Sequence, residues 1–338
     1  MHPVTRRVVL GTAAALPLSA PFIRHARAAD FVFKVATGLL PDHPTNIRLG
    51  EAATNIARDS GGRMELRLFP SSQLGGEADL LHQVQSGAVE IFTIGGLVIS
   101  SVVPMAALDG VGFAFKNYGQ VWPAMDGELG GFLRKAIMDG SPLYVTSKIW
   151  DLGFRQITNS VRPINTLDDL QGMKIRVPSA AAYIELFKAL GASPVDMQYP
   201  EVYPALQTHI VDGQENPLAL AATSHFYEVQ KYCAMTNHMW NGFWCLINAR
   251  AWRRLPSDLQ EIAERDLNAA GLKQRQDLAD LEVTYHDTMA KAGMLFNTPD
   301  TTSFRARLRT SGYYAAARKK LGEKAWALLE AAGGAPLG

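Results

Sequence analysis

The apolar positions in the first part of the chain follow two different periods. Residues 63–69 alternate between charged and apolar side chains, which is the pattern of a strand with one buried face. Residues 44–60 place apolar side chains near helical spacing and end at Gly61-Gly62, a common helix stop. The other elements expected here are strands at 31–37 and 89–94 and a helix at 77–86. This β-α-β-α-β order predicts a mainly parallel sheet with helices on its faces.

A second region repeats this pattern further along the chain. Its expected strands are 153–159, 172–177, 194–197 and 210–213, and its expected helices are 180–190 and 200–208. The segments VQSGAVEI (84–91) and LQTHIVDG (206–213) also resemble each other, since both contain a helix end, a short break and a strand. The repeated order of elements predicts two lobes of similar α/β architecture.

The last third of the chain has a helical pattern. Residues 257–292 contain no proline, and Pro256-Ser257 is a typical helix start. A single helix of this length would measure about 50 Å and could bridge two lobes. Two shorter helices, broken near Gly271, are the alternative. Residues 304–332 are also helical and amphipathic.

The N-terminal 28 residues differ from the rest of the sequence. Two arginines precede an apolar stretch at 8–20, and residues 26–28 (Ala-Arg-Ala) form a small-residue cleavage site. This arrangement is typical of a secretory signal peptide, and TRRVVL (5–10) resembles a twin-arginine signal. A buried N-terminal helix is the alternative. We therefore expect export to the periplasm, cleavage near Ala28, and a mature fold without residues 1–28.

The composition is that of an ordinary globular protein. The 338 residues are 47% hydrophobic and 19% charged, with a formal net charge of +1, which argues against a nucleic-acid surface. The length suggests two domains. The mature chain contains no run of about 20 apolar residues, so we expect no membrane-spanning helix in it. Cys233 and Cys245 lie symmetrically about position 239, as cross-strand partners in a hairpin would. Two buried free thiols are the alternative that we favour.

Signatures of enzymes and metal sites are scarce. The sequence has no G-x-S-x-G elbow, no H-E-x-x-H, no phosphate-binding loop and no G-x-G-x-x-G after a strand. Asp168-Asp169 and Asp212/Glu215 could be acid–base pairs, but Asp168-Asp169 better fit the acidic start of a helix. We therefore expect a protein that is not an enzyme and that needs no metal or other cofactor.

Two arginines are better candidates for binding chemistry. Arg155 and Arg176 belong to expected strands about twenty residues apart, and neighbouring strands would bring both guanidinium groups to one edge. A guanidinium matches a carboxylate with two parallel hydrogen bonds. Ligands of α/β sheets lie beyond the carboxyl ends of strands, next to helix N-termini, and residues 176–179 (Arg-Val-Pro-Ser) occupy such a junction. An anion site is expected there, with an ordinary surface charge as the alternative for either arginine.

Several long segments carry a resemblance to a known family. They are SSQLGGEADLLHQVQSGAVEI (71–91), GFRQITNSVRPINTLDDLQGMKIRVP (153–178), KIRVPSAAAYIELFKALGASPVDM (174–197), EVYPALQTHIVDGQENPLA (201–219) and FYEVQKYCAMTNH (226–238). Together they resemble the solute-binding subunit of tripartite ATP-independent periplasmic (TRAP) transporters over essentially the whole mature chain. The resemblance implies a two-lobed α/β periplasmic binding protein of class II type. Mixed sheets flanked by helices, crossing strands and a long hinge helix belong to that fold.

The resemblance also implies how the chain divides. Lobe I would comprise residues 29–152 and 242–281, the latter containing most of the hinge helix. Lobe II would comprise residues 153–241 and the C-terminal helices at 282–338. The two lobes would close over a small organic acid and then dock on the small and large membrane subunits, whose ion gradient drives uptake.

The resemblance further implies the residues of the site. The arginine of R-V-P, Arg176, would pair with the ligand carboxylate, and Arg155 would assist it. The asparagine of V-D-G-Q-E-N-P, Asn216, would hydrogen-bond the ligand. The other residues expected in the cleft are Tyr199, Ser179, His43, Gly95, Trp150 and Trp240. Trp150, Phe154, Tyr199 and Trp240 are candidates for an aromatic wall, with packing in the core as the alternative.

The ligand is the least determined part of the prediction. The nearest motifs, QENPLA and EVQK…AMTNH, resemble those of sialic-acid binders, but Ser179 replaces an asparagine and residues 93–96 (TIGG) lack an acidic side chain. A polyhydroxylated ligand would then lack partners for its hydroxyl groups. We therefore expect a monocarboxylate, such as a 2-hydroxy or 2-oxo acid with an apolar or aromatic body. The alternatives are a sugar acid such as sialic acid, a periplasmic enzyme exported by the twin-arginine route, and the binding protein of an ATP-driven importer.

Overall fold

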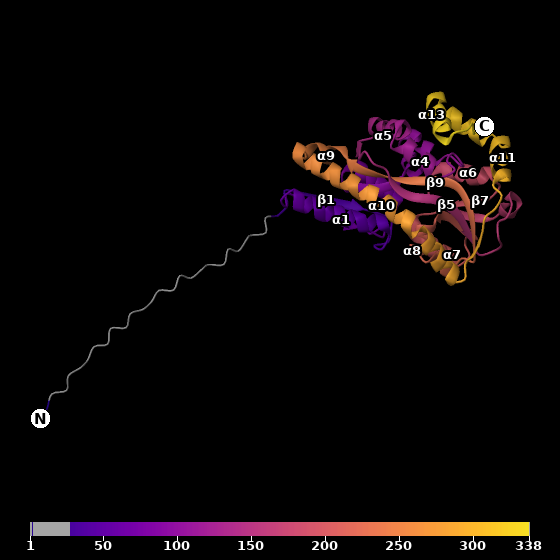
Figure 1. The fold of residues 1–338 in the computed structure, drawn as a ribbon, viewed down its shortest axis with the longest axis horizontal. Helices are drawn as coiled ribbons and strands as arrows, with labels where there is room; N and C mark the ends of the chain where they lie inside the picture. Colours follow the sequence, from indigo (N-terminus) through magenta and orange to yellow (C-terminus); the bar gives the residue numbers. More distant parts are fainter. Residues whose placement is uncertain (1, 3–27, 338) are drawn as a thin grey trace.

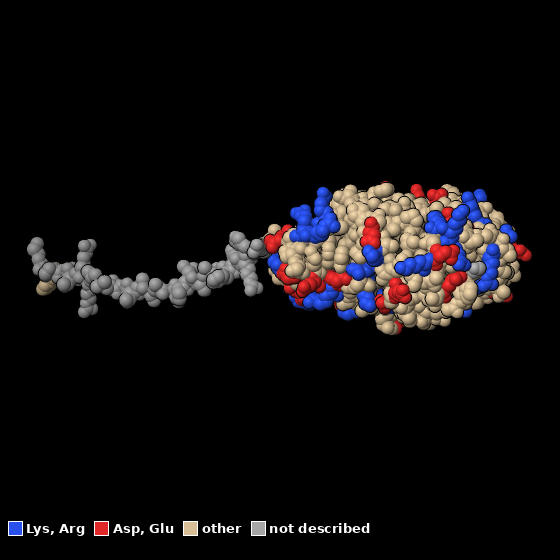
Figure 2. Space-filling view, turned by 90° about the horizontal axis from the view of Figure 1, so that it is seen from above, with Lys and Arg blue, Asp and Glu red and all other residues tan. Residues whose placement is uncertain are grey.

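The computed structural model describes residue 2 and residues 28–337. The predicted signal peptide, with its twin-arginine motif, therefore lies almost entirely outside the described residues. Within the described part, no helix is both long enough and apolar enough to cross a membrane. Figure 2 shows positive and negative side chains interspersed over one face of the molecule, with no large field of a single sign.

One mixed sheet of ten strands runs through the molecule, and helices cover it (Figure 1). The strands are β1 (Phe31–Ala36), β2 (Met64–Phe69), β3 (Ile91–Gly95), β4 (Leu143–Val145), β5 (Trp150–Asn159), β6 (Lys174–Val177), β7 (Ser193–Asp196), β8 (Gly213–Pro217), β9 (Tyr232–Asn248) and β10 (Leu295–Asn297). Their order is β2-β1-β3-β9-β5-β8-β6-β7, and both β4 and β10 also pair with β9. The predicted α/β class with a mixed sheet is confirmed.

The helices connect the strands or close the ends of the chain. They are α1 (Pro44–Asp59), α2 (Glu77–Ser86), α3 (Gly96–Ile99), α4 (Tyr118–Met125), α5 (Glu128–Gly140), α6 (Ala181–Ala189), α7 (Val202–Gln207), α8 (Leu218–Thr223), α9 (Ala249–Arg254), α10 (Ser257–Lys291), α11 (Thr302–Thr310), α12 (Tyr313–Leu321) and α13 (Glu323–Gly333). Short 3₁₀ turns cover Pro104–Gly110, Leu167–Leu170, Tyr199–Glu201 and Phe226–Glu228.

The two ends of the sheet have the same arrangement. At one end β1 pairs in parallel with both β2 and β3, and at the other β6 pairs in parallel with both β7 and β8. The helices α1 and α2 join the first three strands, and α6 and α7 join the second three. The sequence echo thus falls on equivalent elements, since α2 leads into β3 and α7 into β8. The prediction of two similar halves is confirmed.

The expected strand at 210–213 begins later than predicted. Ile210 and Val211 still donate their backbone N–H groups to Ala205 O in α7, so they continue the turn that ends this helix. Asp212 N donates to Lys174 O, and pairing along β8 starts at the next residue. The strand therefore covers Gly213–Pro217.

The strand β9 joins the two halves and was not predicted. Its C-terminal part pairs with β3, and its N-terminal part pairs with β5 and β10. Cys233 and Cys245 lie on this single strand, so they are not cross-strand partners of a hairpin, and the favoured alternative of two free thiols is confirmed. Twelve strand residues span about 40 Å, far beyond the reach of a disulfide. Both cysteines are buried free thiols. Because β9 and β5 carry the sheet without a break, the lobe boundaries at 153, 242 and 282 stay a prediction.

The helix α10 is continuous over 35 residues, so the alternative of two helices is wrong. It runs along the length of the molecule and contacts α1, β5 and α8 (Figure 1). Gly271 does not break it. A Cβ atom at this position would lie 2.9 Å from Trp150 Nε1, so glycine is required for the close approach of α10 to β5. The C-terminal region comprises three further helices, α11 to α13.

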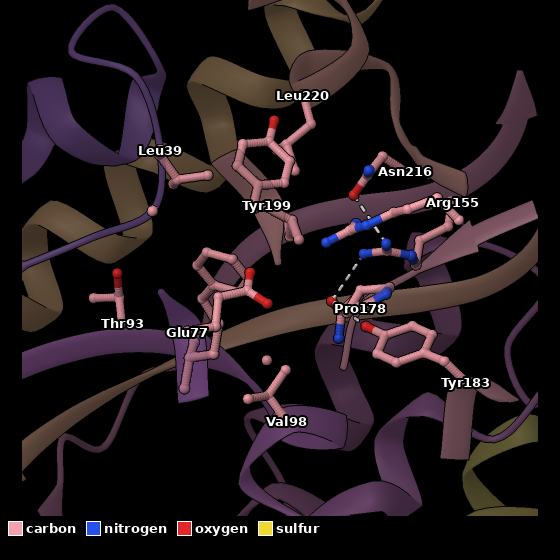
Figure 3. A pocket seen from close by; sticks show the side chains of 17 residues that line it. Leu39, Glu77, Thr93, Val98, Arg155, Pro178, Tyr183, Tyr199, Asn216 and Leu220 are labelled. Carbon is pink, nitrogen blue, oxygen red and sulfur yellow. Dashed lines mark hydrogen bonds between the residues drawn. The ribbon is translucent and has the colours of Figure 1, made fainter. Parts of the chain in front are cut away.

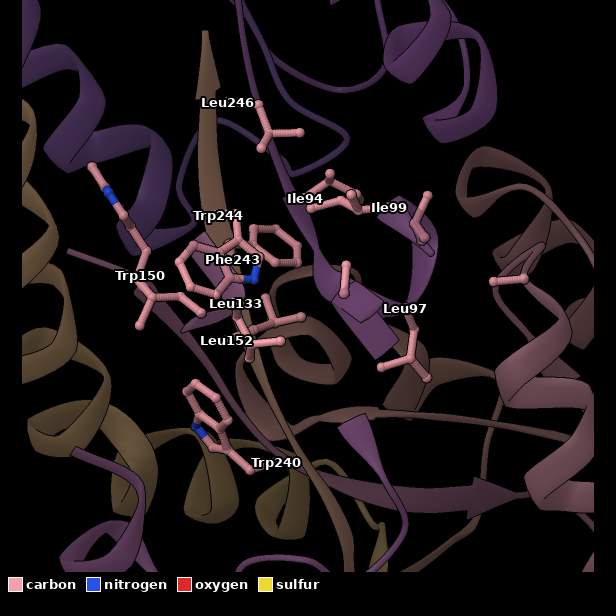
Figure 4. Packing of buried hydrophobic residues seen from close by; sticks show 14 of the residues in the cluster. Ile94, Leu97, Ile99, Leu133, Trp150, Leu152, Trp240, Phe243, Trp244 and Leu246 are labelled. Atoms are coloured by element: carbon pink, nitrogen blue, oxygen red, sulfur yellow. The ribbon is translucent and has the colours of Figure 1, made fainter. Parts of the chain in front are cut away.

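The core lies on both faces of the crossing strands. Figure 4 shows Trp150, Trp240, Phe243 and Trp244 packed among aliphatic side chains from β3, α3 and α5. These four aromatic side chains are at most 6% exposed, and their burial fixes the crossing of β5 and β9. A smaller cluster packs α7 and α8 against the end of α10 and β10.

Candidate anion-binding site

A cavity lies where the two halves of the sheet meet; it is called the central cavity below (Figure 3). Its lining residues are Gly38, Leu39, Glu77, Thr93, Ile94, Gly95, Val98, Leu152, Arg155, Arg176, Pro178, Tyr183, Tyr199, Asn216, Leu220, Asn241 and Phe243. The free space among these side chains is about 20 Å³, which is roughly the room for one water molecule. A larger ligand therefore requires the two halves to separate before it enters.

Arg176 lies on β6 directly before the chain turns into α6, and it is fully buried. Its Nε and Nη2 donate to Met197 O at 3.0 and 2.6 Å, while Nη1 has no partner. Burial lowers the pKa of Arg176, and the carboxylates of Glu77 and Glu215 act against that shift. No carboxylate of the described residues forms an ion pair with it. A buried cation without an ion-pair partner is costly, and an anion bound to Nη1 would lower that cost.

Arg155 on β5 is already neutralised. Its Nε and Nη2 donate to Glu215 Oε2 and Oε1 at 2.5 and 2.8 Å, and Nη2 also donates to Asn216 Oδ1 at 2.9 Å. Burial acts to raise the pKa of Glu215, but Arg155 outweighs it and the pKa stays below its usual range. The Tyr183 ring lies 5.1 Å from the guanidinium carbon. Arg155 is therefore a fixed donor at the cavity wall, whereas Arg176 is the cation that lacks a partner.

A buried histidine supports this pair from behind. His238 Nε2 lies 3.2 Å from Glu215 Oε2, and His238 Nδ1 lies 2.8 Å from Thr236 Oγ1. Burial lowers the pKa of His238, which favours the neutral ring, while Glu215 acts to raise it. A neutral ring that donates from Nε2 to Glu215 and accepts from the Thr236 hydroxyl would hold the Glu215 carboxylate against Arg155.

Asn216 comes from β8, opposite Gln156 of β5. Its Oδ1 accepts from Arg155, and its Nδ2 donates to Gln214 Oε1 at 2.5 Å. The side chain is 2% exposed, so both amide atoms are held in one orientation. Tyr199 follows from the other side of the cavity, with its hydroxyl 2.5 Å from Ser224 Oγ and its ring 5.8 Å from the Arg176 guanidinium carbon.

Glu77 is a site residue that the sequence reasoning missed. It is the first residue of α2, and its side chain reaches into the middle of the cavity, facing Arg155 and Tyr183 (Figure 3). Burial raises the pKa of Glu77, while Arg176 and Arg155 act to lower it. Its backbone N donates to Gln198 Oε1 at 3.0 Å, which joins the two halves across the cavity mouth. An acidic residue at a helix start usually stabilises the helix dipole, so no separate pattern in the sequence indicates this role.

Two further polar groups in the lining have no partner. Thr93 Oγ1 is buried and unpaired, and Asn241 Nδ2 is also unpaired while Asn241 Oδ1 accepts from Arg155 at 3.3 Å. Together with Glu77 they give the cavity hydrogen-bonding groups beyond its arginines. The expected scarcity of partners for hydroxyl groups is therefore wrong.

Five of the predicted site residues line the central cavity, and four do not. Those that line it are Arg176, Arg155, Asn216, Tyr199 and Gly95. Trp150 and Trp240 belong to the core instead. Trp240 Nε1 donates to Asp151 Oδ1 at 2.9 Å, and its ring packs against Trp122 and Phe115. The aromatic wall that these two tryptophans were expected to form is absent from the described lining.

The other two predicted residues, His43 and Ser179, do not line the cavity. His43 caps α1, where its Nδ1 accepts from Thr45 N at 3.2 Å, and burial lowers its pKa to about 3. Ser179 is half-buried and follows Pro178, which does line the cavity. Among the described residues, no group of three or more His, Cys, Asp and Glu side chains could hold a metal ion.

Comparisons with known proteins identify the family of the chain. The family model described as bacterial extracellular solute-binding protein, family 7 (DctP) matches residues 36–318. A solute-binding protein of Roseobacter denitrificans is 33% identical over 264 residues, covering 78% of this chain and 79% of the relative. The 2,3-diketo-L-gulonate-binding periplasmic protein of Escherichia coli is 32% identical, covering 69% and 70%. The sialic acid-binding periplasmic protein of Vibrio cholerae is 30% identical, covering 76% and 79%.

Solved structures show the same fold. A sugar acid binding protein of Advenella mimigardefordensis, in complex with galactonate, has a TM-score of 0.86 and 27% identity, covering 91% of this chain and 100% of that one. A TRAP periplasmic solute-binding protein of Roseobacter denitrificans with L-galactonate has a TM-score of 0.83 and 27% identity, covering 90% and 99%. One of Sulfurospirillum deleyianum with succinate has a TM-score of 0.83 and 26% identity, covering 90% and 98%. The predicted two-lobed fold is thereby confirmed.

Proposed function

This chain belongs to family 7 of the bacterial extracellular solute-binding proteins, the binding proteins of TRAP transporters, and from that premise we propose that it binds a hydroxylated monocarboxylic acid. The acid is held in the central cavity and delivered to the small and large membrane subunits of a TRAP transporter. The protein performs this step in the periplasm, as its named relatives do. Because the family is one of transport proteins, the alternative of a periplasmic enzyme is not retained.

The observation that carries this proposal is the unpaired charge of Arg176. The guanidinium is fully buried, its Nη1 has no partner, and Glu215 is already engaged by Arg155. A ligand carboxylate against Nη1 would form a charge-assisted hydrogen bond, with Arg155 and Asn216 fixed beside it. The ligand therefore carries at least one carboxylate.

Glu77 limits the ligand to a single carboxylate. Glu215 already neutralises Arg155, so Arg176 is the arginine of the lining that is left for a ligand carboxylate, and a second ligand carboxylate would have no arginine of its own. Such a group would lie near Glu77. Two like charges about 6 Å apart repel by about 3 kcal/mol at an effective dielectric of 20, which corresponds to about a hundredfold in affinity.

The same residue favours hydroxyl groups on the ligand. The Glu77 carboxylate accepts hydrogen bonds, while Thr93 Oγ1 and Asn241 Nδ2 are buried and still lack partners. A polyhydroxylated acid would satisfy all three groups, whereas an apolar or aromatic body would leave them unpaired. Relatives and neighbours that bind galactonate or 2,3-diketo-L-gulonate support this choice over an apolar acid.

A thermal-shift screen followed by calorimetry tests the proposal. The probes are galactonate and galacturonate, succinate as the dicarboxylate, and 3-phenyllactate as the acid with an aromatic body. We expect one of the hydroxylated acids to bind with one site per chain and at least about a hundredfold more tightly than succinate. Tighter binding of succinate or phenyllactate than of either hydroxylated acid would overturn the assignment.

A further inference from the structure

A second hollow, of about 310 Å³, lies between residues 113–116, the helices α11 and α12, and the segment after α13; it is called the C-terminal hollow below. It shares no lining residue with the central cavity. Lys116, Arg305 and Arg309 line it, and its lining includes no Asp or Glu. Among the described residues, none of these three cations forms an ion pair. In the described part of the chain, the hollow is therefore a cluster of three positive charges without an ion-pair partner.

Several contacts hold the residues at the floor of the hollow in place. The Arg305 guanidinium carbon lies 4.8 Å from the centre of the Phe113 ring, and Arg305 Nη1 donates to Phe113 O at 3.3 Å. Phe113 has a positive φ of 57°, which is unusual for a phenylalanine, and its N donates to His238 O at 2.8 Å. Tyr314 is 3% exposed, and its hydroxyl donates to Gly112 O at 3.1 Å. These bonds hold the half-buried Arg305 in one position.

The charges repel one another within the hollow. Arg305 and Arg309 stand four residues apart on α11, so they are neighbours on one helix face, where like charges destabilise the helix. Burial lowers the pKa of Arg305, and the charge of Arg309 lowers it further. An anion placed between the two side chains would reverse this repulsion.

A purely structural role accounts for only part of the cluster. Arg309 Nε donates to Leu337 O at 2.9 Å and so holds the end of the chain, with help from Glu330, whose Oε1 accepts from Leu337 N at 2.8 Å. Each arginine uses a single N–H in this way, and four of its five donors remain. The side chain of Lys116 has no bond to the described residues, although it lines the same hollow.

We propose that the C-terminal hollow is a second binding site, for a small polyanion with two or more carboxylate or phosphate charges. Three cations around one space match several charges at once, whereas a single carboxylate would leave two of them unpaired. The exposed lining residues Ala335 and Pro336 offer apolar contacts to the carbon skeleton of a polycarboxylate. This site is independent of the ligand held by Arg176, so its failure would not affect the proposed transport function.

Calorimetry on the mature chain with Arg176→Ala isolates this site, because that change disables the central cavity. Citrate is the probe, with inorganic phosphate as a smaller polyanion and acetate as the single-charge control. We expect citrate to bind with one site per chain, phosphate to bind more weakly, and acetate not to bind at millimolar concentration. The affinity should fall steeply with added salt, since two of the three cations are exposed.

A matched pair of variants decides where the citrate binds. Lys116→Glu reverses a charge inside the hollow without breaking any bond, and Lys319→Glu makes the same change on an exposed residue of α12 outside it. Lys116→Glu should weaken citrate binding at least about tenfold, and Lys319→Glu should leave it unchanged. The proposal is overturned by an absence of citrate binding, by equal weakening in both variants, or by acetate binding as tightly as citrate.

Discussion

Replacing Arg176 tests the central assignment most directly. The side chain is fully buried and donates twice to Met197 O, yet its Nη1 lacks a partner and no carboxylate forms an ion pair with it. Arg176→Ala removes the only cation of the central cavity that is not already neutralised. Arg176→Lys keeps the charge but loses the flat fork of donors, so it separates the contribution of charge from that of geometry.

The expected size of the effect follows from these contacts. Hydrogen bonds to charged groups contribute about 1.5–3 kcal/mol each, and a carboxylate held by a guanidinium makes one or two of them. The alanine variant should therefore lose about 3–5 kcal/mol of binding free energy, or about 10² to 10⁴ in the dissociation constant. The empty protein should change little. Loss of the two bonds to Met197 O is offset by removal of a buried cation without a counter-charge.

Two assays on the same variants are needed. Calorimetry with galactonate gives the affinity, and thermal unfolding without ligand gives the stability of the empty protein. Arg134→Ala is the control, because Arg134 also donates to a backbone carbonyl, Val145 O at 2.7 Å, but does not line the cavity. Unfolding of Arg176→Ala without ligand would make Arg176 a structural residue. Unchanged galactonate affinity would show that the carboxylate binds elsewhere.

Three further changes have defined outcomes. Glu77→Gln should weaken galactonate about tenfold and reduce the preference over succinate, measured by calorimetry, because the charge that repels a second carboxylate is gone. In the wild type the same preference should decline as the pH falls through the raised pKa of Glu77; a constant ratio would refute this. Gly76→Ala places a Cβ 2.7 Å from Gln198 Oε1 and displaces its bond to Glu77 N, so small-angle scattering should show a more open protein with ligand. Gly131→Ala, which meets no atom within 4 Å, should leave the scattering curve unchanged. Asp109→Asn should raise stability at pH 8 by up to about 4 kcal/mol, but not near pH 4. Burial raises the pKa of Asp109 from 3.8 to about 7, so the unfolded chain loses this proton first and stability falls as pH rises between those values. If the wild type and Asp109→Asn melt alike at every pH in this range, the raised pKa of Asp109 is contradicted.

Local pattern predicted the elements that have one exposed face. β2 alternates between buried and exposed residues, and α1 ends near its two glycines, so both were readable from the sequence. β9 has no such alternation, because nearly all of its 17 residues are buried. The symmetric spacing of Cys233 and Cys245 instead pointed to a hairpin about position 239. Only pairing partners from both halves of the molecule, which are distant in sequence, make this segment one strand.

The site divides in the same way. Arg155 and Arg176 were predicted from their places on neighbouring expected strands, and Arg176 also from its position at a junction between a strand and a helix. In the sequence, Trp150 and Trp240 look no different from tryptophans that line a binding cleft. Only the packing of β5, β9 and α10 around them shows that they belong to the core. Glu77 was missed for the opposite reason: an acidic residue at a helix start is common and does not indicate a binding residue. Its role comes from the approach of α2 to β6 and to Gln198, which no local pattern contains.

Arg155 has an ion-pair partner and Arg176 has none, and this difference links ligand binding to closure of the two halves. Arg155 stays charged and keeps its ion-pair partner Glu215 within its own half of the sheet, so the pair is neutral overall whether or not a ligand is present. Where the halves meet, Glu77 and the lining residues of β3 cover Arg176 without forming an ion pair with it. We infer that the cost of burying Arg176 without an ion-pair partner disfavours the empty closed state. A ligand whose carboxylate reaches Arg176 and whose hydroxyl groups reach Glu77 removes the cost and bonds to both halves at once. Its differential affinity for the closed state therefore shifts the population toward closure, and the same shift should disappear in Arg176→Ala.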